Sequence, residues 1–248
     1  MRTGLGLGFI LAAVTAAGSA AAMEPAGSAV AVIQQASADL SGQTLVLEPG
    51  DALFMGQTVI TGPDGQVQVV FNDNTHLVVG PGSSLVIAEY LMRNDQTASK
   101  FVINALSGTF RFVTGNSPKN AYEIQTPTGT IGVRGTAFDF GIDPETRETH
   151  VLLYHGGVRM CDEVGGCTEM ADTCAVGIIP DHAQAAVLNE GDKRKPPILS
   201  DFPYLKSERP LRDDFRIPGY GRCRSIEVAE AETAPIVAEA PPPPPPPP

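Results

Sequence analysis

The stretch Thr126–Phe140, TPTGTIGVRGTAFDF, decides between two classes of fold. Three glycines occur in it at three-residue spacing: Gly129, Gly132 and Gly135. Glycine-rich segments bind phosphate when they lead into a helix whose N-terminal N–H groups face the anion. Here no lysine follows, and residues 136–142, TAFDFGI, alternate, with Phe138 and Phe140 on one face. Because alternation is typical of a strand, we expect turns and close backbone packing, and no nucleotide site.

The same alternation recurs on both sides of this stretch. Residues 66–71 and 100–106 place their apolar side chains on one face, and residues 108–113 put Phe110 and Phe112 inward and Arg111 outward. Further strands are expected at 75–80, 85–90, 149–156 and 158–161. Turn signals separate them, as in GPDG (62–65) with its turn glycines Gly62 and Gly65. Short strands at this spacing predict an all-β fold, either a twisted solenoid-like or a sandwich-like one.

The chain divides by composition. Residues 1–22 have a basic residue, an apolar run and a small-residue site, which predicts a secretory signal peptide. Residues 23–192 contain 7 Lys/Arg and 20 Asp/Glu, whereas residues 193–224 contain 9 and 4. We therefore expect residues 176–224 to form a basic, cysteine-bearing segment that wraps over an acidic domain. The acidic, proline-rich end, residues 225–248, is expected to be disordered.

Four cysteines are expected to form two disulfides, because the spacing does not suit a zinc site and an exported protein meets an oxidising compartment. Cys161 and Cys167 flank DEVGG, which resembles a hairpin turn, so we expect these two to pair. Cys174 and Cys223 then pair by elimination, which would tie the basic segment to the domain.

Four separated motifs resemble the FecR-like domain family. They are residues 50–87 with PGSSL near the end, LSGTFRFV (106–113), YEIQTPTGTIGVRGTAFDF (122–140) and VLLYHGGVRM (151–160). The resemblance implies a β-rich domain over residues 27–175 that works outside the cytoplasm. Well-known members sense the occupied state of an outer-membrane transporter and signal to a sigma factor. We do not recognise their anti-sigma segment, membrane helix or transporter-contacting region in this sequence.

Candidate sites for chemistry are weak. The acids Asp51, Asp73, Asp139 and Asp143 could bind calcium, but the pattern FNDNT (71–75) fits a solvated turn better. His150 and His155 fall on opposite faces of a strand, which disfavours a shared metal. Arg134 is the candidate contact for a partner, although pairing with an acid of its own domain is the more ordinary role. We expect no catalytic residues, no metal and no cofactor.

The function expected from these features is a non-enzymatic binding, sensing or scaffold module of the cell envelope. Its partner would be an envelope protein or a cell-wall component; the acidic domain disfavours nucleic acid, and no stable membrane insertion is expected. The protein would be periplasmic or secreted. Two alternatives stay open: a soluble relay in outer-membrane transporter signalling, and an envelope hydrolase with an unrecognised site.

Overall fold

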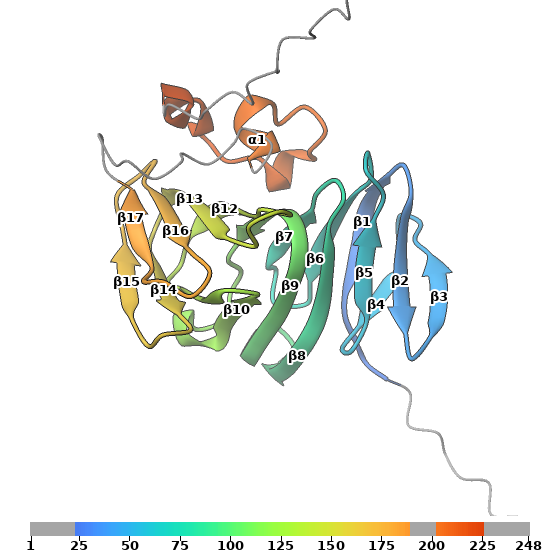
Figure 1. Cartoon of the computed structure of the whole chain (residues 1–248). Helices are drawn as coiled ribbons and strands as arrows, with labels where there is room; N and C mark the ends of the chain where they lie inside the picture. The colour runs from blue at the N-terminus through green and yellow to red at the C-terminus, as the bar shows by residue number, and fades with distance from the viewer. Residues whose placement is uncertain (1–22, 189–201, 226–248) are drawn as a thin grey trace, which may run out of the picture.

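A computed structural model describes residues 23–188 and 202–225 (Figure 1). The expected signal peptide lies outside the described residues, as does the expected tail beyond residue 225. Strands dominate, as the alternation predicted, and they form two layers that we call sheet A and sheet B. The layers are open and do not close into a barrel.

Sheet A is antiparallel throughout the described residues. In spatial order its strands are β4 (Ala52–Phe54), β1 (Pro25–Ile33), β6 (Gln66–Phe71), β7 (His76–Val79), part of β9 (Thr97–Val113), β12 (Ala137–Ile142), β13 (Thr149–His155), β16 (Val176–Ile179) and β17 (Ala186–Leu188). Strands β16 and β17 continue the sheet past residue 175, where the domain was expected to end.

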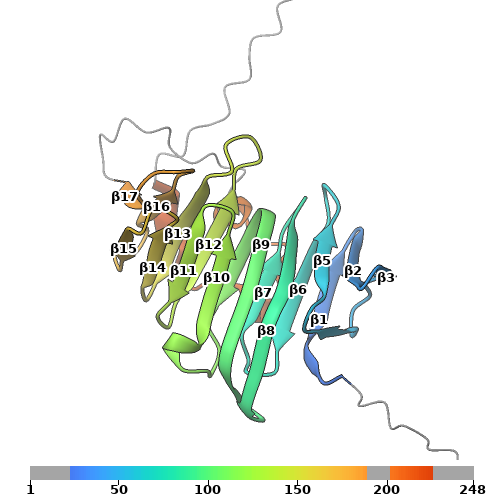
Figure 2. The ribbon, with the colours of Figure 1, turned by 60° about the horizontal axis from the view of Figure 1, so that its bottom comes forward.

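Within the described part of the chain, sheet B has one parallel contact, between β9 and β10; its other pairs are antiparallel. In spatial order its strands are β3 (Gln43–Val46), β2 (Ala36–Leu40), β5 (Thr58–Thr61), β8 (Ser84–Asn94), the rest of β9, β10 (Tyr122–Thr126), β11 (Gly129–Val133), β14 (Val158–Asp162) and β15 (Cys167–Met170). Figure 2 shows β8, β9 and β10 side by side in the middle of the molecule.

Strand β9 belongs to both sheets. Its first part pairs with β8 and β10, and the part from Gly108 onward pairs with β7 and β12. Gly108 has a φ of +96°, and a Cβ there would lie 2.5 Å from the Cα of Ser83. Only glycine combines that backbone with so close an approach, so Gly108 is where the chain turns from one layer into the other. The two strands expected at 100–106 and 108–113 are therefore one bent strand.

The core lies between the two sheets. Phe71 of sheet A and Phe101 of sheet B have ring centroids 4.5 Å apart, which shows that the layers pack face to face as a sandwich. Phe110, Phe112, Phe138 and the other residues expected inside are buried in the same cluster. Alternation thus assigned the inward faces correctly, because successive side chains of a strand point to opposite faces of the sheet.

Residues 202–225 cross the outer face of sheet A, and we call this segment the strap. It consists of α1 (Pro203–Lys206), the 3-10 turns Asp213–Phe215 and Tyr220–Ser225, and irregular chain between them. Figure 1 shows it in orange and red above β12 and β13. Its apolar side chains pack on the sheet, with Phe202 and Leu205 against Leu152, and Tyr204 in a cluster with Val78.

Two disulfides match the pairs expected from the sequence. Cys161 and Cys167 face each other across the β14–β15 hairpin, with Cα atoms 4.1 Å apart. Cys174 and Cys223 join the loop before β16 to the end of the strap, across 49 residues of sequence. The second bond therefore fastens the strap to the sandwich.

Candidate functional site

The glycine run forms a hairpin and leads into a strand. Strands β10 and β11 pair from Thr126 and Gly129 outward, β11 then pairs with β14, and β12 begins at Ala137. A Cβ on Gly129 would lie 2.1 Å from the carbonyl oxygen of Cys161, so this glycine permits close contact between strands. No helix follows, which removes the anion-binding N-terminus that a phosphate loop requires. That the run binds no nucleotide stays a prediction.

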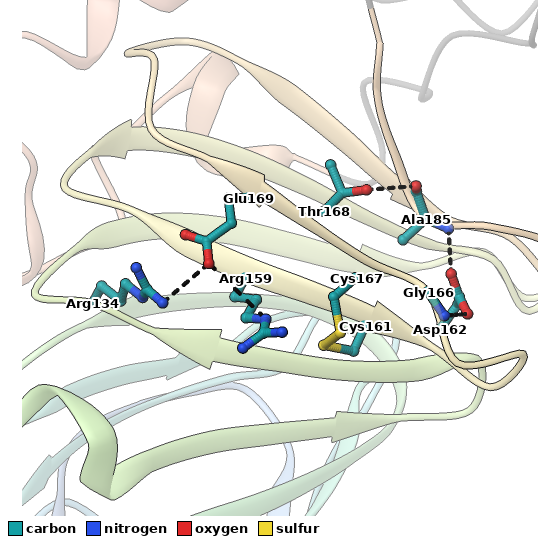
Figure 3. Close-up of a disulfide and its surroundings, with 9 residues drawn as sticks. All are labelled: Arg134, Arg159, Cys161, Asp162, Gly166, Cys167, Thr168, Glu169 and Ala185. Carbon is teal, nitrogen blue, oxygen red and sulfur yellow. Dashed lines mark hydrogen bonds and ion pairs between the residues drawn. A yellow bond between two sulfur atoms is a disulfide. The ribbon is translucent and has the colours of Figure 1, made fainter.

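Arg134 lies on the surface, and Figure 3 shows Glu169 and Arg159 between it and the Cys161–Cys167 disulfide. Its guanidinium lies 3.0 Å from the carboxylate of Glu169, and Arg159 lies 4.0 Å from the same carboxylate oxygen. The side chains of Arg134 and Glu169 are 55% and 52% exposed. Arg134 thus pairs with an acid of its own domain while more than half of it remains exposed to solvent.

Asp162 closes the turn that follows Cys161. It accepts N–H groups from Ala185 at 2.8 Å and from Gly166 at 2.7 Å, one on each carboxylate oxygen (Figure 3). The N–H of Ala185 first, and those of the turn with it, hold the pKa of Asp162 below its usual value. Asp162 therefore joins the hairpin to the chain before β17 while it is ionised.

A cluster of buried charged side chains lies beneath the strap. Arg111, on β9, is fully buried and donates to both carboxylate oxygens of Asp139 on β12, at 2.6 and 2.9 Å. It also donates to Glu208 of the strap and to the hydroxyl of Tyr154, the latter at 3.1 Å. The pattern predicted that Arg111 points away from the core, and it does, but the strap covers it. The Arg111 guanidinium thus binds two carboxylates, Asp139 of sheet A and Glu208 of the strap.

Burial and neighbouring charges shift the pKa values of the residues in this cluster. Burial, the largest single influence, lowers the pKa of Arg111, but the charge and hydrogen bonds of Asp139, together with Tyr154 and Glu208, outweigh it and raise that pKa above its usual value. Burial, followed by the charge of Asp139, raises the pKa of Tyr154 and of Tyr204. The rings of both tyrosines lie about 5 Å from the Arg111 guanidinium carbon, 5.0 and 5.1 Å. Arg111 therefore stays charged and the tyrosines stay neutral.

Cross-strand pairing puts this cluster in a row of side chains that we call the docking row. It runs across the outer face of sheet A in register: Gln68, Val78, Arg111, Asp139, Leu152 and Val176. Gln68 donates to the carbonyl of Pro210 at 3.0 Å and accepts the N–H of Arg212 at 2.8 Å. The strap is therefore held by side chains of the sheet and adds no strand to it.

A second polar network is buried at Asp73, where the sequence favoured a solvated turn. Asp73 has no exposed surface. Its carboxylate accepts the hydroxyls of Ser117 at 2.6 Å, Tyr122 and Thr75 at 2.9 Å and Tyr90 at 3.3 Å. The solvated-turn interpretation was wrong, because residues far away in the sequence enclose the turn. Asp73 therefore has a structural role: its carboxylate accepts hydrogen bonds that connect its own turn to the segments that carry Tyr90, Ser117 and Tyr122.

The other residues considered for metal binding are dispersed. His150 is buried near the start of β13, and His155 is exposed at its end. Asp51 accepts the N–H of Glu48, and Asp143 accepts two N–H groups of its own loop. Glu163, Asp181 and His182 gather within 4.8 Å of one another, but all three are exposed. Such exposed acidic groups occur widely without an ion.

Sequence reasoning missed the docking row and Glu208. A signal was present, since Arg111 and Asp139 each stand between two core phenylalanines and must therefore share the outward face of their strands. Nothing in the sequence showed that β9 and β12 are neighbours, or that residue 208 returns to cover them. Both facts depend on long-range pairing.

Comparison with known families is decisive for the β domain. Residues 57–159 match the family model described as FecR protein. Residues 57–159 are a FecR domain. The matched region runs from the residue before β5 into β14, so it includes the glycine run and Arg111, which confirms the predicted resemblance. Proteins of the FecR family are associated with the cell envelope, and the family is a regulatory one. Among residues 23–188 and 202–225, no helix is both long and apolar enough to cross a membrane.

One curated protein and two solved structures show partial similarity to the chain. A protein of Cereibacter sphaeroides named fructose-1,6-bisphosphatase class 1 1 is 32% identical over 121 residues, which are 48% of this chain and 35% of that protein. The chain thus spans about a third of that relative. Two crystal structures of a provisionally named anti-sigma factor from Parabacteroides distasonis give TM-scores of 0.43 at 14% and 16% identity. They cover 54% and 60% of this chain, and 59% and 73% of theirs. At those TM-scores neither structure adds to the description of fold or function.

Proposed function

We propose that the chain is a non-enzymatic module of the cell envelope that binds, senses or holds an envelope protein or a cell-wall component. The match of residues 57–159 to the FecR family carries this proposal. Two features support it: the leader-like composition of residues 1–22, and two disulfides, which persist in oxidising compartments. The mature protein would then work in the periplasm or outside the cell.

Arg134 is the side chain that we propose for a partner contact. It lies beside Arg159 and Glu169 on a surface where all three are more than half exposed. An exposed ion pair of this kind contributes about 0–1 kcal/mol, so a partner carboxylate can replace Glu169 at little cost. Rim charges of this kind set the rate and selectivity of association more than its strength.

Transporter signalling is a narrower form of the same proposal, supported by the regulatory character of the FecR family. The chain would then act as a soluble relay between an outer-membrane transporter and a later component. The hydrolase alternative is tested through the relative from Cereibacter sphaeroides, whose name gives fructose 1,6-bisphosphate as the substrate to assay.

The test immobilises the full mature chain and measures saturable capture of components from an envelope extract of the source organism. Arg134→Glu is compared with Arg93→Glu, which makes the same charge change at an exposed position of β8. We expect capture to fall at least tenfold for Arg134→Glu and to stay unchanged for Arg93→Glu. Equal capture by both variants would refute the role of Arg134. Failure of every form to capture a component, or turnover of fructose 1,6-bisphosphate, would refute the binding-module proposal.

A further inference from the structure

The outer face of sheet A beneath the strap has the chemistry of a recognition surface. Val78, Leu152 and Val176 of the docking row are buried there beside a fully buried Arg111. An apolar face with one embedded guanidinium suits a segment that presents a carboxylate among apolar side chains, because a guanidinium binds a carboxylate with directed hydrogen bonds.

The strap presents that combination. Tyr204, Leu205 and Leu211 are buried on either side of Glu208 along the strap. The carboxylate of Glu208 binds Arg111 and accepts the N–H of Ile217 at 3.1 Å. The fold of the strap thereby places the Glu208 carboxylate opposite the Arg111 guanidinium.

A basic side chain of the sheet meets an acidic side chain of the strap at a second point of this interface. The imidazole of His76, on β7, lies 3.7 Å from the carboxylate of Asp214 and packs edge-on against Phe215, with ring centroids 4.8 Å apart. At both points the sheet supplies the base and the strap supplies the acid. The strap has a basic composition overall, so its net charge does not account for this polarity; the positions of the individual residues do.

The way in which the strap is attached allows exchange. Its helix has four residues, and Gln66 and Gln68 make the hydrogen bonds that bind its backbone and the Tyr204 hydroxyl. Lifting it would break side-chain contacts while the strand ladders of sheet A stay intact. Glu208 also brings a second carboxylate to a guanidinium that Asp139 already binds through two hydrogen bonds.

We propose that the strap is an intramolecular occupant of a peptide-binding face. The partner that this face fits is an irregular peptide segment with a carboxylate side chain between aromatic and aliphatic residues, which competes with the strap for Arg111. The Cys174–Cys223 disulfide favours the closed state because it keeps the strap at high local concentration over the face. This inference rests on the proposed binding function and adds a second contact surface, on sheet A, to the one proposed at Arg134.

The experiment uses a fluorescent peptide with the sequence of residues 202–219, FPYLKSERPLRDDFRIPG, and measures its binding to the full mature chain by anisotropy. The wild-type chain should bind it weakly, because the attached strap occupies the face. Replacing both Cys174 and Cys223 by Ser should raise the apparent affinity at least tenfold, since that affinity scales with the open fraction. The matched peptide with Gln in place of Glu208 should bind at least tenfold more weakly.

If loss of the Cys174–Cys223 disulfide unfolds the chain, a variant that keeps the disulfide can still test peptide binding. Gln68→Ala removes two hydrogen bonds to the strap backbone and leaves both disulfides and the Arg111 cluster in place. It should also raise peptide affinity, by a smaller factor. The proposal is wrong if a folded variant binds no peptide, or if the Glu and Gln peptides bind equally. Such a result would leave capture of envelope components by another surface unaffected, so the two proposals can fail separately.

Discussion

Replacing Arg111 by methionine removes the charge that neutralises the interface between sheet A and the strap. Methionine roughly fills the space of the aliphatic stem, so the main change is electrostatic. Asp139 is then left buried without its cation, and Glu208 loses its charged partner. Breaking a buried ion pair in this way costs about 3–5 kcal/mol, because an uncompensated charge stays in a medium of low polarity. For a domain of this size that corresponds to a fall in Tm of roughly 6–20 °C.

Arg134→Met is the matched control. It removes the same charge from an ion pair of similar length, 3.0 Å to Glu169, but in solvent. An exposed pair is worth about 0–1 kcal/mol, so the expected change in Tm is small. The contrast between the variants isolates burial as the cause.

The assay is equilibrium unfolding in urea at pH 7 with both disulfides intact, followed by circular dichroism. The double variant Arg111→Met with Asp139→Asn should recover part of the loss, because the amide carries no charge and can still accept the Tyr154 hydroxyl. If Arg111→Met and Arg134→Met differ by less than about 1 kcal/mol, the cluster does not stabilise the fold as argued from its burial.

Three further outcomes are expected. Gly129→Ala should destabilise the chain by about 1–3 kcal/mol, because its Cβ would lie 2.1 Å from a facing carbonyl oxygen, whereas Gly132→Ala, with 3.7 Å to its nearest atom, should be nearly neutral in the same urea assay. Asp162→Asn should be less stable than wild type at pH 7, because the amide N–H₂ meets a backbone donor. Because folding lowers the pKa of Asp162, its contribution to the stability of the fold is present above the unfolded pKa of about 3.9 and is lost as the pH falls through the folded pKa. Melting curves should therefore show that the difference in Tm between wild type and Asp162→Asn becomes smaller below about pH 4. A difference in Tm that stays constant with pH would contradict this. A chain that ends at Ser225 should melt at the same temperature as the mature chain, and a fall of many degrees would show that the remaining residues pack on the domain.

Several features of this protein could be determined from its sequence alone. Alternation identified β6 and β12 and the side chains that each turns toward the core, because a strand that lines a core must place an apolar side chain at every second position. It also predicted β13 as a strand. The short loop between Cys161 and Cys167 was enough to predict their disulfide, since a hairpin brings its flanking residues together. The resemblance of four separated motifs to the FecR-like family pointed to the FecR domain. In each case the signal is local, or a set of local signals in order.

Only the tertiary structure decided what covers each outward face. The pattern of β9 shows that Arg111 points away from the core, but it cannot show whether water, a strand or a strap lies beyond. The same holds for Asp73, whose turn is enclosed by Tyr90 and Tyr122. Strands β1 to β3 were not expected, and they too depend on pairing with distant partners. Periodicity records the direction of a side chain, whereas its neighbours are set by contacts between segments far apart in sequence, and no short window of residues contains that information.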